Sequence, residues 1–136
     1  MFPAHGKISL QIHERILIAE VEGPWNEELI YKYQAMMQPA VEELSDNGSW
    51  GLIVVIRNEA LCPPEAVAAI HKGVEIQARR YSRACTAYVI SPNVEGYHIL
   101  DNIWRSIYSP SFSFEIFESL EDAMQWTKMT IENCKV

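Results

Sequence analysis

The sequence predicts an α/β domain with a mostly parallel five-stranded sheet, a first strand antiparallel to the others, and four flanking helices. The stretch 52–56 is a continuous apolar run rich in β-branched residues, which is typical of a strand covered on both faces. Strand-like and helix-like segments follow one another in the order β-β-α-β-α-β-α-β-α. The length of 136 residues, with 49% hydrophobic and 21% charged residues, suits one domain over 1–136.

The first third of the chain predicts a hairpin followed by a helix. Polar and apolar residues alternate over 7–13, and the stretch 15–22 is again strand-like after a tight turn. Asn26, followed by two glutamates, is a suitable cap for a helix whose apolar spacing extends over 29–44. Pro39 should kink this helix, because its ring clashes with the preceding turn and its nitrogen cannot donate a hydrogen bond.

The second helix should begin at Pro63-Pro64-Glu65, because proline suits the first helical turn and an acid there complements the helix dipole. It should extend to about Ser82. The other predicted elements are a strand over 84–90, a third helix between 92 and 107, a short strand over 112–117 and a last helix from about 119 through 131.

The composition excludes several classes of function. A net charge of -7 disfavours an extended nucleic-acid interface, which needs clustered Lys and Arg. No apolar stretch approaches the roughly 18 residues of a membrane-spanning helix, and the first residues do not resemble a signal peptide. Three scattered cysteines suit no closed disulfide framework, so a cytoplasmic location is expected.

The chain resembles the sulfate-transporter and anti-sigma-factor-antagonist (STAS) fold, and more narrowly the SpoIIAA-like group of small bacterial proteins. The resemblance spans nearly the whole chain. It rests on the opening hairpin, on the strands containing 54–56 and 88–90, and on the closing segment 117–126, which is similar to that group's "F-x-s-x-e-x-A-x-x-W" pattern. The resemblance implies a regulatory binding module without catalytic activity or cofactor.

One feature departs from that group. In anti-sigma-factor antagonists, a phosphorylatable serine lies at the start of the second helix, whereas this chain has Cys62-Pro63-Pro64-Glu65 there and no hydroxyl residue over 57–72. Glu65 supplies a negative charge in about that place, although an acid in a first helical turn is favoured by the dipole alone. A phosphorylation switch at this helix start therefore has no acceptor.

The crevice beyond the carboxyl ends of parallel strands is the usual binding place in such sheets. The central strand ends there and the second helix begins there, so this region is the predicted surface for a protein partner or a second copy of the chain. Trp25 follows Gly-Pro in a loop and is either an exposed anchor, a lid on an apolar pocket, or part of the core. The candidate binding residues are Trp25, Arg57, Asn58, Glu59, Cys62 and Glu65.

Two other hypotheses stay open at this point. A carrier of a small apolar or lipid-like ligand would use Met36 and Met37 to line an elongated pocket between the first helix and the sheet. A small thiol enzyme would use Cys62, since a helix N-terminus favours the nucleophilic thiolate. The four histidines show no metal-binding spacing, and Arg79, Arg80 and Arg83 form a basic cluster that suits a helix C-terminus or an anion site.

Overall fold

The computed structural model describes residues 7–23, 25–57, 63–91, 93–94 and 113–133. Its elements follow the predicted order, except that the predicted third helix lies outside the described residues. They are β1 (Lys7–His13), β2 (Ile16–Glu22), α1 (Glu27–Ser45), β3 (Trp50–Arg57), α2 (Pro64–Arg80), β4 (Arg83–Ile90), β5 (Ser113–Phe117) and α4 (Leu120–Asn133).

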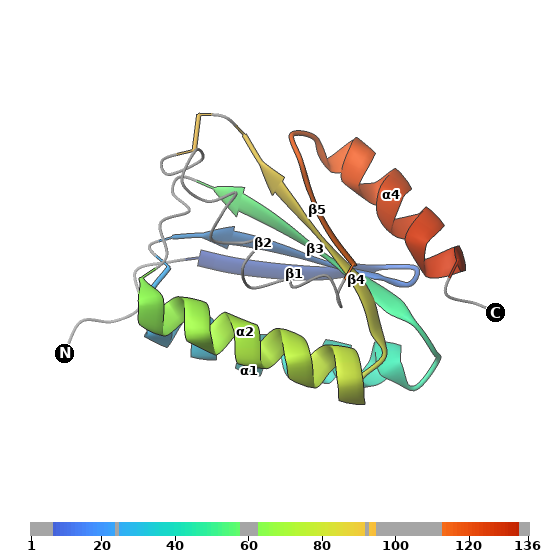
Figure 1. Cartoon of the computed structure of the whole chain (residues 1–136), viewed down its shortest axis with the longest axis horizontal. Coiled ribbons are helices and arrows are strands. Elements are labelled where there is room, and N and C mark those ends of the chain that lie inside the picture. The colour runs from blue at the N-terminus through green and yellow to red at the C-terminus, as the bar shows by residue number, and fades with distance from the viewer. Residues whose placement is uncertain (1–6, 24, 58–62, 92, 95–112, 134–136) are drawn as a thin grey trace.

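The five strands form one sheet in the order β1-β2-β3-β4-β5 (Figure 1). β1 pairs antiparallel with β2, and each of the other neighbouring pairs is parallel. The mixed five-stranded sheet predicted from the sequence is therefore confirmed. β3 lies at its centre and is buried along its whole length up to Arg57, as the β-branched run predicts.

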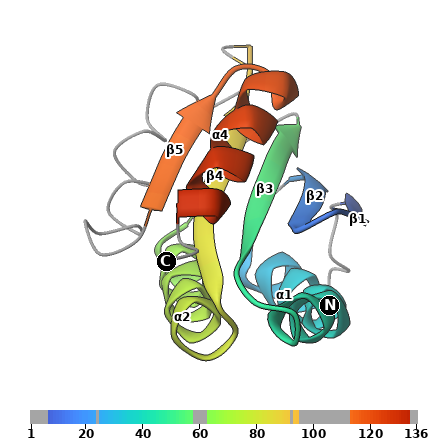
Figure 2. The ribbon, with the colours of Figure 1, turned by 90° about the vertical axis from the view of Figure 1, so that its right-hand side faces the viewer.

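Helices cover both faces of the sheet (Figure 2). α1 and α2 pack on one face, over a large core that includes Leu17, Leu52, Val54 and Tyr88. α4 packs on the other face, over a smaller core that includes Ile16, Ile53, Ala87 and Ile131. Within the described residues, no helix has the length and apolar character needed to cross a membrane.

The helix starts follow the predicted chemistry. Asn26 caps α1 by accepting a hydrogen bond from the backbone N–H of Leu29 at 2.8 Å. α2 begins at Pro64 with Pro63 as its cap residue, and it ends at Arg80, two residues before the expected end. Pro39 lies within α1 on its exposed side, and the kink expected there stays a prediction.

Candidate functional site

The carboxyl edge of the sheet brings charged residues from three strands together. Arg57 is the last residue of β3, Glu22 lies opposite it in β2, and Lys7 of β1 lies opposite Glu22. Side chains directly opposite one another in a sheet point to the same face. The three strands therefore present a row of alternating charge on the face that α4 occupies further along the sheet.

Arg57 is held by an ion pair with β2. Its Nε donates to Oε1 of Glu20 at 2.8 Å, and the two side chains are 58% and 50% exposed. The pair lies in a depression of about 580 Å³ that Lys7, Glu22 and Lys32 also line. Such exposed pairs contribute little to stability. They do hold charged groups in a defined arrangement at the surface.

The start of α2 is exposed at the same edge. Pro63, Pro64 and Glu65 are all exposed, and Pro63, the cap residue, makes no side-chain hydrogen bond to the first turn of the helix. α2 packs on the face of the sheet opposite to the one that carries Arg57. Arg57 and Glu65 thus flank the carboxyl edge from its two sides.

Three of the predicted binding residues, Asn58, Glu59 and Cys62, lie outside the described residues. Their part in this surface stays a prediction, and so does the thiol chemistry considered for Cys62. Among the described residues, no group of three or more His, Cys, Asp or Glu side chains is placed to hold a metal ion.

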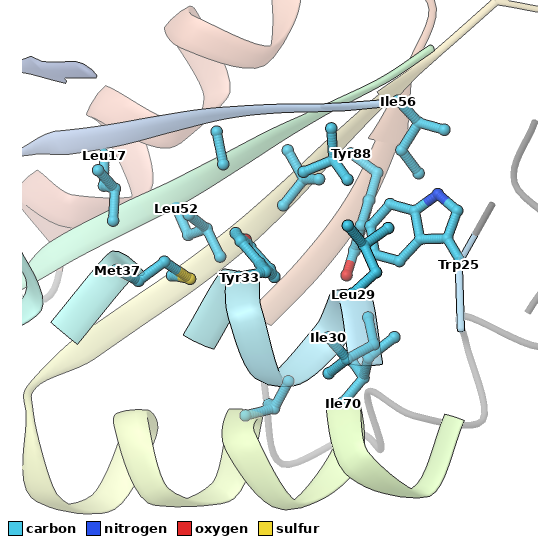
Figure 3. Packing of buried hydrophobic residues seen from close by; sticks show 14 of the residues in the cluster. Leu17, Trp25, Leu29, Ile30, Tyr33, Met37, Leu52, Ile56, Ile70 and Tyr88 are labelled. Atoms are coloured by element: carbon cyan, nitrogen blue, oxygen red, sulfur yellow. The ribbon is translucent and has the colours of Figure 1, made fainter. Parts of the chain in front are cut away.

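Trp25 is buried, so among the alternatives of exposed anchor, pocket lid and core residue the structure supports the core, and the anchor interpretation is wrong. Its side chain is only 1% exposed and belongs to the large core. Figure 3 shows the indole beside Leu29 and Ile30 of α1, with Ile70 of α2 nearby. Because indole carries the largest apolar surface of any side chain, its burial between helix and sheet is favourable. Trp25 therefore belongs to the large core and is not a residue of the exposed binding surface.

The elongated apolar pocket expected of a ligand carrier is not formed between α1 and the sheet by the described residues. The cavity there, lined by Trp25, Tyr33 and Met37 among others, measures about 20 Å³. That volume holds about one water molecule. Met37 is buried whereas Met36 is 41% exposed, so the two methionines do not line one pocket together. The space predicted for a ligand is filled by side chains.

The basic cluster predicted at the end of α2 is divided by the fold. Arg79 and Arg80 are exposed at the helix end, where they complement its dipole. Arg83 starts β4 and is buried, and it donates to Oε1 of Gln77 at 2.9 Å and from Nε to Oγ1 of Thr86 at 2.8 Å. The guanidinium of Arg83 thus ties α2 to β4.

The sequence interpretation missed Glu20, Glu22 and Lys7 as members of the surface around Arg57. The alternation along β1 and β2 indicates that these side chains face solvent. Their proximity to Arg57 depends on the register between β2 and β3, which places Glu22 opposite Arg57. The sequence carried no local signal for this, because β3 is buried up to Arg57 and has no alternation that would fix its register against β2.

Comparisons with known proteins support the fold. No family model matches the sequence, and no curated protein sequence matches it significantly. A solved structure of an anti-sigma factor antagonist from Mycobacterium paratuberculosis is similar over 93% of this chain and 97% of that chain, with a TM-score of 0.61 and 11% sequence identity. The chain therefore has the fold of an anti-sigma factor antagonist, as its resemblance to STAS proteins implies.

Proposed function

We propose that this protein is a non-catalytic, cytoplasmic regulatory module that binds a protein partner through the carboxyl edge of its sheet. The binding surface consists of the exposed end of β3 at Arg57 and the exposed start of α2 at Glu65. We call it the carboxyl-edge surface. The observation that carries the proposal is the charged depression around the Arg57–Glu20 pair, together with the exposed residues Pro63 to Glu65 at the same edge of the sheet.

The chemistry of this surface favours a protein partner. Lys7, Lys32 and Arg57 alternate with Glu20 and Glu22 around the depression. A polyanion needs clustered positive charge, whereas mixed charges complement the mixed charges of another protein surface. The shared fold adds support, because the similar solved structure is described as an anti-sigma factor antagonist.

Regulation of this surface would differ from a phosphorylation switch at the start of α2. Residues 57–72 contain no serine, threonine or tyrosine. Glu65 instead provides a permanent negative charge in the first turn of α2. We infer that binding is not switched by phosphorylation of a serine, threonine or tyrosine at the start of α2.

Site-specific photo-crosslinking in the native host tests the proposal. A photoreactive amino acid at position 65 should form an adduct with one partner protein, and Arg57→Glu in the same chain should abolish that adduct. The same photoreactive group at Met129, which is exposed on α4, is the matched control and should not capture this partner. No adduct at position 65, or an equal adduct at both positions, would contradict the proposal.

A further inference from the structure

β1 is an edge strand of the sheet, with β2 on one side (Figure 2). All seven of its residues pair with β2, from Lys7↔Glu22 to His13↔Ile16. On its other side, the described residues place no strand. The backbone N–H and C=O groups on that side can pair with another strand of suitable sequence.

The side chains of β1 separate cleanly between the two faces of the sheet. Ile8 and Leu10 pack partly against the large core, and Ile12 continues this row but is 43% exposed. Lys7, Ser9, Gln11 and His13 occupy the other face and are exposed. The apolar row thus reaches solvent at the molecular edge.

Helix α1 extends the apolar row. Lys32 of α1 lines the same depression as Lys7 and Ile8, so this side of the helix lies beside β1. Met36 follows one turn later on the same side of the helix. Its exposed side chain and that of Ile12 are both large apolar groups at this edge. A partner strand that covers Ile12 would therefore meet an apolar helix flank as well.

We propose that β1 pairs antiparallel with β1 of a second copy of this chain, about a two-fold axis at Leu10. This register joins all seven residues of each strand. It places Leu10 opposite the second copy's Leu10, Ile8 opposite Ile12, Ser9 opposite Gln11 and Lys7 opposite His13. Apolar side chains meet only apolar ones, and polar side chains meet only polar ones, as a stable strand pair requires. The two sheets become one sheet of ten strands.

Charge favours this pairing of like strands. Lys7 is the first residue of β1, and Glu14 directly follows its last residue. In an antiparallel pair of two copies, the start of each β1 lies beside the end of the other, so this arrangement occurs at both ends of the pair. Glu14 approaches Lys128 of α4 at 3.9 Å, so its carboxylate lies on the face that also carries Lys7. The second copy's Lys7 then lies close to Glu14 on one face. Self-pairing is therefore electrostatically complementary.

Neighbouring registers are less suitable. A shift that centres the axis on Gln11 places Ile8 opposite Glu14, and a shift to Ser9 leaves Ile12 and His13 without opposite residues in β1. Each of these two axes changes the pairing of the strands by two residues. A change of the pairing by one residue would set apolar side chains opposite polar ones. The sequence of β1 thus selects the register centred on Leu10.

This interface adjoins the depression around Arg57, with which it shares Lys7, but its centre at Leu10 lies away from Arg57 and Glu65, and it does not rest on the proposed function. β2 lies between β1 and the strand that ends at Arg57. Glu65 belongs to α2, on the far side of α1 from β1. A dimer through β1 would present two carboxyl-edge surfaces to partners.

Light scattering coupled to size-exclusion chromatography tests the inference. The full chain should have twice its 15.6 kDa mass, and Ile12→Lys should reduce the mass to that of one chain. Met129→Lys is the matched control, since it also places lysine at an exposed apolar site but on α4. It should leave the doubled mass unchanged. A wild-type chain of single mass, or an Ile12→Lys chain of doubled mass, would overturn the inference.

Disulfide trapping tests the register. In a chain with Cys62→Ser and Cys134→Ser, the pair Ser9→Cys and Gln11→Cys should yield a covalent dimer on mild oxidation, because residues 9 and 11 of the two copies face each other. Ser9→Cys alone should not, since the two positions 9 are two residues out of register. Absence of the double-variant dimer, or equal cross-linking by the single variant, would contradict the proposed pairing.

Discussion

At the scale of single residues, Gly51 sets how closely α4 approaches the sheet. A Cβ atom at this position would lie 2.5 Å from Cγ2 of Thr127, 3.0 Å from Sγ of Cys85 and 3.2 Å from Cδ1 of Ile131. Thr127 and Ile131 belong to α4, and both are buried. Because glycine has no side chain at this position of β3, α4 can pack closely against the sheet.

We expect Gly51→Ala to lower the free energy of unfolding by about 2 kcal/mol, because a methyl group here overpacks the core under α4. Thr127→Ser removes the nearest methyl group, so the double variant should lose less than the sum of the single losses. Chemical denaturation of the four proteins measures this coupling. If the stability losses of the two single variants were strictly additive, the contact between position 51 and Thr127 would not be the cause of the loss in Gly51→Ala.

Gly73→Ala is a suitable control for this experiment. Its Cβ would meet Nε2 of Gln34 at 2.5 Å, but that atom is the far end of a flexible side chain. Alanine also has a higher helix propensity than glycine by about 1 kcal/mol. Gly73→Ala should thus be nearly neutral, and a large loss would mean that the hydrogen bond of Gln34 to the carbonyl oxygen of Ala69 matters more than expected.

At the scale of elements, Arg15 joins the β1–β2 turn to the end of α1. Its Nη2 donates to the carbonyl oxygens of Leu44 at 2.6 Å and Gly48 at 2.8 Å, and its Nε donates to that of Ser49 at 3.0 Å. The last turn of α1 contains no basic residue of its own. Arg15 therefore supplies the positive charge that a helix C-terminus favours.

Arg15→Ala should cost about 2 kcal/mol of unfolding free energy, since hydrogen bonds from a charged donor exceed neutral ones. Arg15→Lys should lose less unfolding free energy than Arg15→Ala but still fall below the wild type, because a single ammonium group cannot reproduce the fork of the guanidinium. Urea denaturation measures both variants. The exposed Arg79→Ala should change stability by less than about 0.5 kcal/mol. If Arg15→Ala lowered the free energy of unfolding by no more than Arg79→Ala does, Arg15 would not stabilise the end of α1 as proposed.

At the scale of the whole molecule, folding and binding depend on different groups. The two cores on either side of the sheet are apolar, whereas the carboxyl-edge surface consists of exposed charged side chains. Buried apolar area dominates the stability of a domain, and exposed ion pairs add little to it. The surface charges can therefore be changed without unfolding the protein.

We expect Arg57→Glu to change the free energy of unfolding by less than about 1 kcal/mol while it abolishes partner capture at position 65. Combining it with Glu20→Arg should restore the ion pair and any lost stability but not the capture, because the partner meets the charges in exchanged places. Denaturation curves and photo-crosslinking measure the two effects separately. If the double variant captured the partner fully, binding would require only the presence of the ion pair and not the positions of its two charges.

Much of the fold could be predicted because hydrophobic periodicity records which side of each segment is buried. The buried run around Ile53, the alternation in β1 and the prolines before Glu65 are local signals, and each marks the element that the structure contains. The opening hairpin follows from two strands separated by a tight turn. With helix-length connections between the later strands, a mostly parallel sheet is the expected result.

The site could be predicted only in part. The exposed ends at Arg57 and Glu65 follow from where a strand ends and a helix begins. The burial of Trp25 contradicts its local context, because a loop position does not reveal that α1 folds back over the sheet to cover it. Met36 and Met37 are neighbours in sequence, yet one is exposed and the other buried.

The order and type of the described elements and the direction of the first strand follow from the amino-acid sequence alone, since these features depend on local periodicity and turn chemistry. The fold is needed to show that Glu20 pairs with Arg57, that Gly51 lets α4 approach the sheet and that Arg15 binds the end of α1. Each of these contacts joins residues far apart in the chain. They depend on strand register and on the approach of packed layers, which no single segment encodes.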